Sequence, residues 1–126
     1  MDVFVYGTLR SPERAREVLG HADFGPGTRL RGLHRVEARY PTLAPGGATD
    51  GRVLRLRDGD LGALDAYEGV DRGLYVRVRV PGDRGALWTY VGDPDRLDAA
   101  VTWPGAGPFR RRVERYVDAN DVRAES

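Results

Sequence analysis

The chain has 126 residues, a net charge of +1 and no cysteine, so we expect a single domain without disulfides, a thiol nucleophile or a zinc–thiolate site. Its balanced charge lacks the basic footprint of a nucleic-acid-binding protein. All twenty basic residues are arginine, which excludes Schiff-base chemistry and a Walker-type phosphate clamp, because both need lysine.

The first twenty residues predict a strand, a glycine turn and a helix in succession. Residues 2–6 are apolar on both faces, which is typical of a strand inside a sheet. Ser11 fits the N-cap of a helix, Pro12 its first position and Gly20 the residue that ends it.

The middle of the chain combines two strands, a loop and a second helix. Residues 28–37 and 51–57 have strand character, and residues 38–48, which contain Pro45-Gly46-Gly47, are predicted as a loop between them. A turn over residues 58–60 leads into a helix at 61–68, which Gly69 ends.

The second half begins with a predicted hairpin. Val76, Val78 and Val80 share one face of a strand at 74–80, and the turn at 81–85 joins it to a returning strand at 86–91. Weaker patterns follow: a short helix at 95–101, a Gly/Pro loop at 103–109, a helix or a strand at 110–117, and a frayed tail at 120–126.

These elements predict an α+β domain over residues 1–119 with a flexible tail at 120–126. Hairpin-length links and two or three short helices favour a small, mostly antiparallel β-barrel or curled sheet. Without a signal-peptide h-region or a membrane-length apolar run, we expect a cytoplasmic protein with no membrane or nucleic-acid partner. No long apolar helix indicates an obligate partner, so we expect a monomer or a weak homodimer.

Glu68 is the leading candidate for chemistry. In the helix at 61–68, Leu61, Leu64 and Glu68 fall on one face, with Asp65 toward the outer face, so a carboxylate lies on an apolar stripe. Burial would raise its pKa, as a general acid/base working near neutral pH requires. The alternative is that Glu68 bends out to solvent or pairs with an arginine.

The segment Tyr6-Gly7-Thr8-Leu9 is the second candidate. Gly7 allows close backbone approach and positive φ. The amide N–H groups that follow it can point at one ligand atom. The alternative is an ordinary turn between a strand and a helix.

Other polar and aromatic residues carry weaker signals. Tyr75 begins a strand whose polar face can line a cavity, or it is a rim aromatic, and Tyr40-Pro41 fits a pocket wall or a simple turn. Trp88 and Tyr90 fit packing roles better than ligand contacts, and Arg110, Arg111 and Arg112 fit a solvated helix or strand face. His21, His34 and Ser11 lack the sequence spacing that a metal site or a serine hydrolase site requires.

The order of these segments resembles the gamma-glutamylcyclotransferase-like family. Tyr-Gly-Thr-Leu at 6–9 is similar to the family's Tyr-Gly-Ser/Thr-Leu motif, and Leu-Asp-Ala-Tyr-Glu-Gly at 64–69 is similar to its Leu-Asp-x-x-Glu-Gly segment. Tyr-Pro-Thr-Leu at 40–43 looks like the family's loop, and the strands at 75–91 follow in the right order. The resemblance covers about residues 3–92.

This resemblance implies a small barrel-like fold with a cavity, without a metal or cofactor. It implies that Glu68 is the acid/base residue and that the Tyr6–Leu9 amides hold a glutamyl group. Members release 5-oxoproline from gamma-glutamyl compounds, and the short chain looks closest to the gamma-glutamylamine branch. The substrate-binding candidates are Tyr6, Gly7, Thr8, Leu9, Tyr40 and Tyr75.

The implied reaction suits the composition, because the α-amine of the substrate attacks its own γ-carbonyl and no protein nucleophile is needed. Whether the Gly7–Leu9 amides bind the substrate carboxylate or the oxyanion stays open at this point. Two other functions also stay open: a non-catalytic module that binds a small metabolite in the same pocket, and an enzyme acting on a non-glutamyl conjugate.

Overall fold

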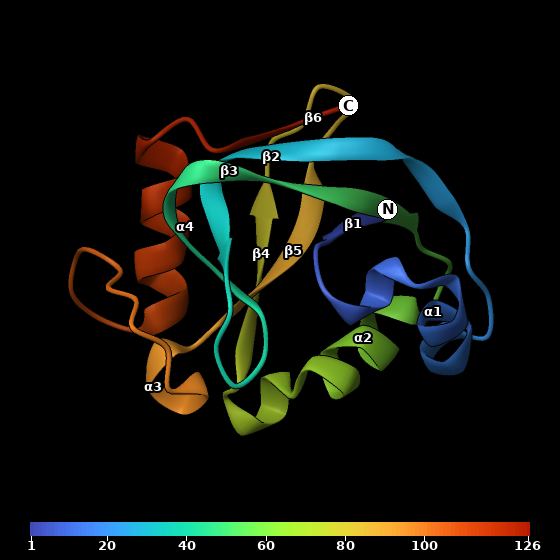
Figure 1. Ribbon diagram of the computed structural model, residues 1–126, viewed down its shortest axis with the longest axis horizontal. Helices are drawn as coiled ribbons and strands as arrows, with labels where there is room; N and C mark the ends of the chain where they lie inside the picture. The colour runs from blue at the N-terminus through green and yellow to red at the C-terminus, as the bar shows by residue number, and fades with distance from the viewer.

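The computed structural model describes residues 1–126 as one curled sheet with helices packed on both faces (Figure 1). Its six strands are β1 (Asp2–Val5), β2 (Phe24–Val36), β3 (Thr42–Arg55), β4 (Tyr75–Val80), β5 (Leu87–Gly92) and β6 (Arg123–Glu125). Its helices are α1 (Pro12–Leu19), α2 (Asp60–Glu68), α3 (Pro94–Leu97) and α4 (Phe109–Ala119), with short 3-10 turns η1 (Thr8–Arg10) and η2 (Val70–Arg72).

The strand order is β4-β5-β1-β3-β2-β6, and only the β1–β5 pair is parallel. This confirms the predicted α+β class with a curled, mostly antiparallel sheet. The most extensive pairing is the long β2–β3 hairpin, which crosses the top of the view in Figure 1. None of the helices combines the length and the apolar character that crossing a membrane requires.

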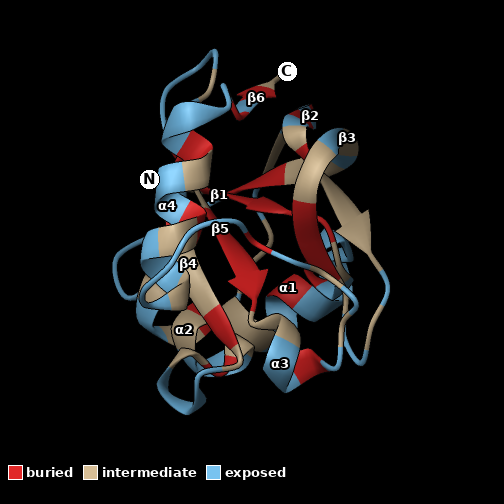
Figure 2. Cartoon of the chain, turned by 90° about the vertical axis from the view of Figure 1, so that its left-hand side faces the viewer, coloured by how far each residue is buried: buried red, intermediate tan, exposed pale blue.

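The central strand β1 is buried on both faces, as predicted. Its side chains alternate between two apolar clusters, because successive residues of a strand point to opposite faces. Phe4 belongs to the cluster that includes Val113 and Val117 of α4, and Val3 belongs to the cluster that includes Ala15 of α1 and Leu64 of α2. Figure 2 shows the buried strands between these helices. The C-terminal end of β1 therefore lies in the middle of the molecule, between two apolar clusters.

Both helices near the end of β1 begin or end as the sequence predicts. The Ser11 side chain accepts a hydrogen bond from Arg14 N–H at 3.4 Å, and Gly20 ends α1 with φ 83°. Gly69 ends α2 with φ 68°, and a Cβ there would lie 2.8 Å from Leu74 Cδ1. Glycine is therefore required directly after Glu68, which fixes Glu68 in the last turn of α2.

The loop predicted over residues 38–48 is wrong, because β3 already begins at Thr42. Its ladder with β2 runs from Val36–Thr42 to Leu33–Pro45 and resumes at Arg31–Ala48. Between these pairs β3 holds one more residue than β2, which is a β-bulge. Gly46 and Gly47, with φ 94° and 69°, absorb the extra residue. The Pro-Gly-Gly sequence thus bends a continuous strand instead of ending it.

The flexible tail predicted at 120–126 is also wrong. Val122 and Ala124 are buried, and β6 pairs with β2 at the edge of the sheet. Ala124 N–H also donates to Pro81 O at 2.8 Å. The ambiguous segment 110–117 is helical within α4. The short helix expected at 95–101 is the four-residue α3, which ends at Leu97 with Asp98 as its C-cap.

Candidate active site

Glu68 lies on the same face of α2 as Leu64, which is fully buried. The Glu68 side chain is half-buried. Burial raises the pKa of its carboxyl group from 4.5 to about 7, and no hydrogen-bond donor or cation of the protein offsets that burial. A carboxyl group with this pKa exists in both protonation states near neutral pH, so it can accept a proton and give one back.

The backbone after β1 forms a single 3-10 turn with unused donors. Its hydrogen bonds run from Arg10 N–H to Gly7 O and from Ser11 N–H to Thr8 O, both at 3.1 Å. The amides of Gly7, Thr8 and Leu9 take no part in these bonds, because the first N–H groups of a helical turn have no acceptor within it. Three consecutive donors therefore remain at the end of β1.

Gly7 does not use the positive φ that glycine allows, because its φ is −121°. A Cβ at this position would have the Pro41 ring at 3.9 Å, an ordinary contact distance. Glycine at this position leaves the space between the loop and Pro41 open.

A cavity of about 420 Å³ joins the two candidate regions. Every site residue that the sequence analysis selected lines it, although these residues come from four separate parts of the chain: Tyr6, Gly7, Thr8, Leu9, Tyr40, Glu68 and Tyr75. The fold thus brings the glycine loop and the unpaired carboxyl group to one space.

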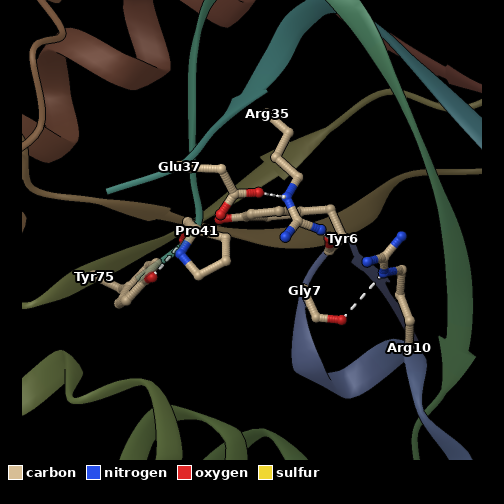
Figure 3. Close-up of polar contacts among 7 residues, drawn as sticks. All are labelled: Tyr6, Gly7, Arg10, Arg35, Glu37, Pro41 and Tyr75. Atoms are coloured by element: carbon tan, nitrogen blue, oxygen red, sulfur yellow. Dashed lines mark hydrogen bonds and ion pairs between the residues drawn. The ribbon is translucent and has the colours of Figure 1, made fainter. Parts of the chain in front are cut away.

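Three tyrosine hydroxyls near this carboxyl group each donate to an acceptor of the protein. Tyr6 donates to the carbonyl of Tyr90 at 2.5 Å, Tyr75 to the carbonyl of Pro41 at 2.5 Å (Figure 3), and Tyr90 to Asp65 Oδ1 at 2.7 Å. Burial, followed by neighbouring negative groups, raises the pKa of all three hydroxyls. They therefore stay neutral near pH 7, and the glutamate is the group on the cavity wall that titrates there.

Asp65 is a residue whose position the sequence analysis assigned wrongly. It does not face outward: its carboxylate accepts hydrogen bonds from Arg77 Nη1 at 3.0 Å and from the Tyr90 hydroxyl. These contacts tie α2 to β4 and β5. Asp65 precedes Glu68 by three residues, and this spacing puts the two on neighbouring parts of one helix face. Tyr90, which we assigned to packing, also lines the cavity.

Exposed side chains mark the open side of the cavity. Tyr40 is 51% exposed, and the Tyr67 hydroxyl lies 2.8 Å from Thr8 Oγ1, which links α2 to η1. Arg14 and Arg72 also line the cavity and are exposed. Sequence reasoning missed these two arginines and Tyr67, because nothing in the pattern distinguishes them from other surface residues.

The remaining candidates lie elsewhere. His21 Nε2 contacts Asp60 Oδ2 at 2.7 Å, and His34 Nδ1 contacts Gly46 O at 3.0 Å. Arg110 and Arg111 are exposed on α4, as predicted for a solvated face. The same prediction is wrong for Arg112, which is half-buried because it donates to the carbonyl of Trp103 at 3.3 Å. No three side chains of the histidine, aspartate or glutamate type gather in an arrangement that could hold a metal ion.

The curled half-barrel sheet and its helices have the gamma-glutamyl cyclotransferase fold. The family model described as "Gamma-glutamyl cyclotransferase, AIG2-like" matches residues 3–108. The chain belongs to this family, as its motifs predicted.

The individual relatives share between 22% and 36% of their residues with this chain in the aligned regions. AIG2-like protein C of Arabidopsis thaliana is 36% identical, over 75% of this chain and 62% of the relative. A solved gamma-glutamyl cyclotransferase shares the fold with a TM-score of 0.62 at 22% identity, covering 74% of this chain and 66% of that one. A solution structure from Arabidopsis thaliana has a TM-score of 0.59 at 28% identity, covering 93% and 77%. The chain thus spans less than two thirds of the first two relatives.

Proposed function

We propose that this protein cleaves a gamma-glutamyl amide and releases 5-oxoproline and a free amine. The α-amine of the substrate attacks its own γ-carbonyl carbon, a carbon–nitrogen bond forms within a five-membered ring, and the bond to the leaving amine breaks. The α-ammonium group loses two protons over the reaction, and the leaving nitrogen gains two. The reaction needs proton transfer and positioning but no covalent enzyme intermediate.

The observation that carries the proposal is the unpaired, half-buried Glu68 on the wall of the cavity. With a pKa of about 7, its carboxylate takes a proton from the α-ammonium group and the resulting acid protonates the leaving nitrogen. Cysteine, histidine, serine and lysine are all missing from the cavity lining. The Thr8 hydroxyl is paired with Tyr67. Because this lining offers no side-chain nucleophile, it fits a reaction in which the substrate supplies its own nucleophile.

The free amides of Gly7, Thr8 and Leu9 supply the complementary part of the site. They lie on the cavity wall and offer backbone N–H groups to a substrate carboxylate or to the oxyanion that develops on the γ-carbonyl. Holding the glutamyl chain folded keeps the amine within reach of the carbonyl. For the leaving group we propose a simple amine, as the Tyr-Gly-Thr-Leu segment favours.

The proposal is tested by measuring 5-oxoproline release from a panel of gamma-glutamyl amines, gamma-glutamyl amino acids and glutathione. Glu68→Gln is assayed alongside Glu114→Gln, whose glutamate is exposed on α4 and lies outside the cavity lining. We expect wild-type protein and Glu114→Gln to release 5-oxoproline, fastest from a gamma-glutamyl amine, and Glu68→Gln to lose this activity.

The same assay can overturn the proposal. Folded wild-type protein that releases nothing from any member of the panel would contradict it. If 5-oxoproline then raised the melting temperature without being produced, the protein would be a binding module.

A further inference from the structure

Two arginines hold successive carbonyl groups of the loop after β1. Arg35 Nη1, from β2, donates to the carbonyl of Tyr6 at 2.6 Å. Arg10 Nε donates to the carbonyl of Gly7 at 3.2 Å, in addition to the backbone bond from Arg10 N–H. Figure 3 shows the two guanidinium groups on either side of the Tyr6–Gly7 segment. Each carbonyl of this segment is thus occupied by a cation.

The direction of a carbonyl fixes the direction of the next amide. A trans peptide is planar, so the C=O of one residue and the N–H of the next point in opposite directions. The chain contains no cis peptide bond. Since the Tyr6 carbonyl points to Arg35, the Gly7 N–H points away from it, and the Thr8 N–H likewise points away from Arg10.

The two arginines lie outside the cavity, whereas Tyr6, Gly7 and Thr8 line it. Arg10 lines a separate, shallower cleft, which shares only Gly7 and Thr8 with the cavity. The Gly7 N–H group lies on the side of the Tyr6–Gly7 peptide opposite Arg35, and Gly7 lines the cavity whereas Arg35 does not. We propose that Arg35 is a positioning residue that aims the Gly7 N–H group at the bound substrate.

Arg35 is well placed for this role. Its side chain is only 26% exposed, and Glu37 Oε1 accepts from its Nε at 2.8 Å, which orients the guanidinium plane. The Glu37 side chain is 71% exposed, so the pair adds little stability by itself. A cation bound to a peptide carbonyl polarises the peptide and makes its N–H group a stronger donor. Arg35 therefore acts on the substrate through the Tyr6–Gly7 peptide.

The identity of the ligand rests on the proposed function, but the orientation of the amides does not. The test therefore begins with ligand-free protein. Backbone 15N relaxation and residual dipolar couplings are measured for Gly7 and Thr8 in wild type, Arg35→Ala, Arg35→Lys and Arg29→Ala. Arg29 is the matched control, because it lies on the same strand and pairs with Asp50 at 2.8 Å. 5-oxoproline is then titrated into each protein.

We expect Arg35→Ala to lower the order of the Gly7 N–H vector and to weaken 5-oxoproline binding by about tenfold, the effect of one lost charged hydrogen bond. Arg35→Lys, which keeps one cationic donor, should restore part of both effects, and Arg29→Ala should change neither. An unchanged Gly7 vector in folded Arg35→Ala would overturn the positioning role. Wild-type protein that does not bind 5-oxoproline would count against the proposed function, while the ligand-free measurement still decides the role of Arg35.

Discussion

The acidic side chains at the two ends of helix α2 are both shielded from solvent, but their surroundings differ. At its beginning, Asp60 is only 7% exposed, yet its carboxylate accepts hydrogen bonds from Arg57 N–H at 2.7 Å and contacts His21 at 2.7 Å. At its end, Glu68 is half-buried and unpaired. Burial alone would raise the pKa of Asp60, but hydrogen bonds from Arg57 and His21 outweigh it and lower that pKa. The pKa of Glu68 rises to about 7.

The difference teaches that burial does not by itself make a carboxyl group reactive. What distinguishes Glu68 is the lack of a protein partner, because an ionised carboxylate is stabilised by donors and cations around it. Asp60 uses its charge to join α2 to the residues before it and to the end of α1. Glu68 keeps its protonation equilibrium near neutral pH and faces a cavity.

The largest expected contrast between the two acids is in turnover. Glu68→Gln should lower kcat for 5-oxoproline release by about 10²–10⁴-fold, the usual effect of losing a general acid/base. Asp60→Asn should leave kcat per folded molecule within about threefold, since Asp60 lies outside the cavity lining and such effects are below one kcal/mol. Steady-state kinetics on folded protein measures both, and a loss smaller than tenfold in Glu68→Gln would remove Glu68 from its role.

A second contrast lies in how stability depends on pH. The folded protein keeps Glu68 protonated up to about pH 7, whereas the unfolded chain releases this proton near pH 4.5, so stability falls as the pH rises through this interval. Glu68→Gln removes the free-energy cost of ionising this buried carboxyl group in the folded state. The variant should therefore be more stable than wild type above pH 7, by at most about 3 kcal/mol given the partial exposure of the side chain.

Urea unfolding at pH 4 and pH 8 checks this prediction, with Glu114→Gln as the control. The advantage of Glu68→Gln should vanish at pH 4, where both states are protonated. A variant that is less stable than wild type at pH 8 would show that Glu68 has a stabilising partner.

Asp60 should behave in the opposite way and with a smaller effect. Its pKa is lowered on folding, so its contribution is present above pH 3.8 and is lost as the pH falls through the folded value. Asp60→Asn should destabilise the protein by about 1–2 kcal/mol at pH 7, because asparagine still accepts from Arg57 N–H. Thermal unfolding from pH 7 to pH 2.5 should show the difference shrinking, and a constant difference would contradict the assignment.

Local signals predicted most of the fold. The strand at 2–6, the helix between Ser11 and Gly20 and the hairpin of β4 and β5 follow from alternation, capping residues and turn residues, which act within a few positions. The bulged start of β3 did not follow, because a Pro-Gly-Gly segment has the same composition in a bulge as in a loop. The pairing of β6 with β2 did not follow either, since it depends on a partner almost a hundred residues away.

The candidate site shows the same contrast between features set by the local sequence and features set by contacts with distant residues. Glu68 and the loop at 6–9 were predictable because each interrupts a local pattern. Asp65 and Arg35 were not, because their roles depend on contacts with Tyr90 and with the carbonyl of Tyr6 from other elements. A sequence of alternating arginines does not indicate which one turns toward a loop.

The most direct test of the proposed acid/base role of Glu68 is a carbon-13 NMR titration of the Glu68 and Asp60 carboxyl carbons in the intact protein. It needs no substrate, and the two ends of α2 control for each other. We expect a pKa of about 7 for Glu68 and a pKa below 3.8 for Asp60. A Glu68 carboxyl group that titrates near pH 4.5 would contradict this role, because it would be an ordinary solvated acid without the proton affinity that the proposed reaction needs.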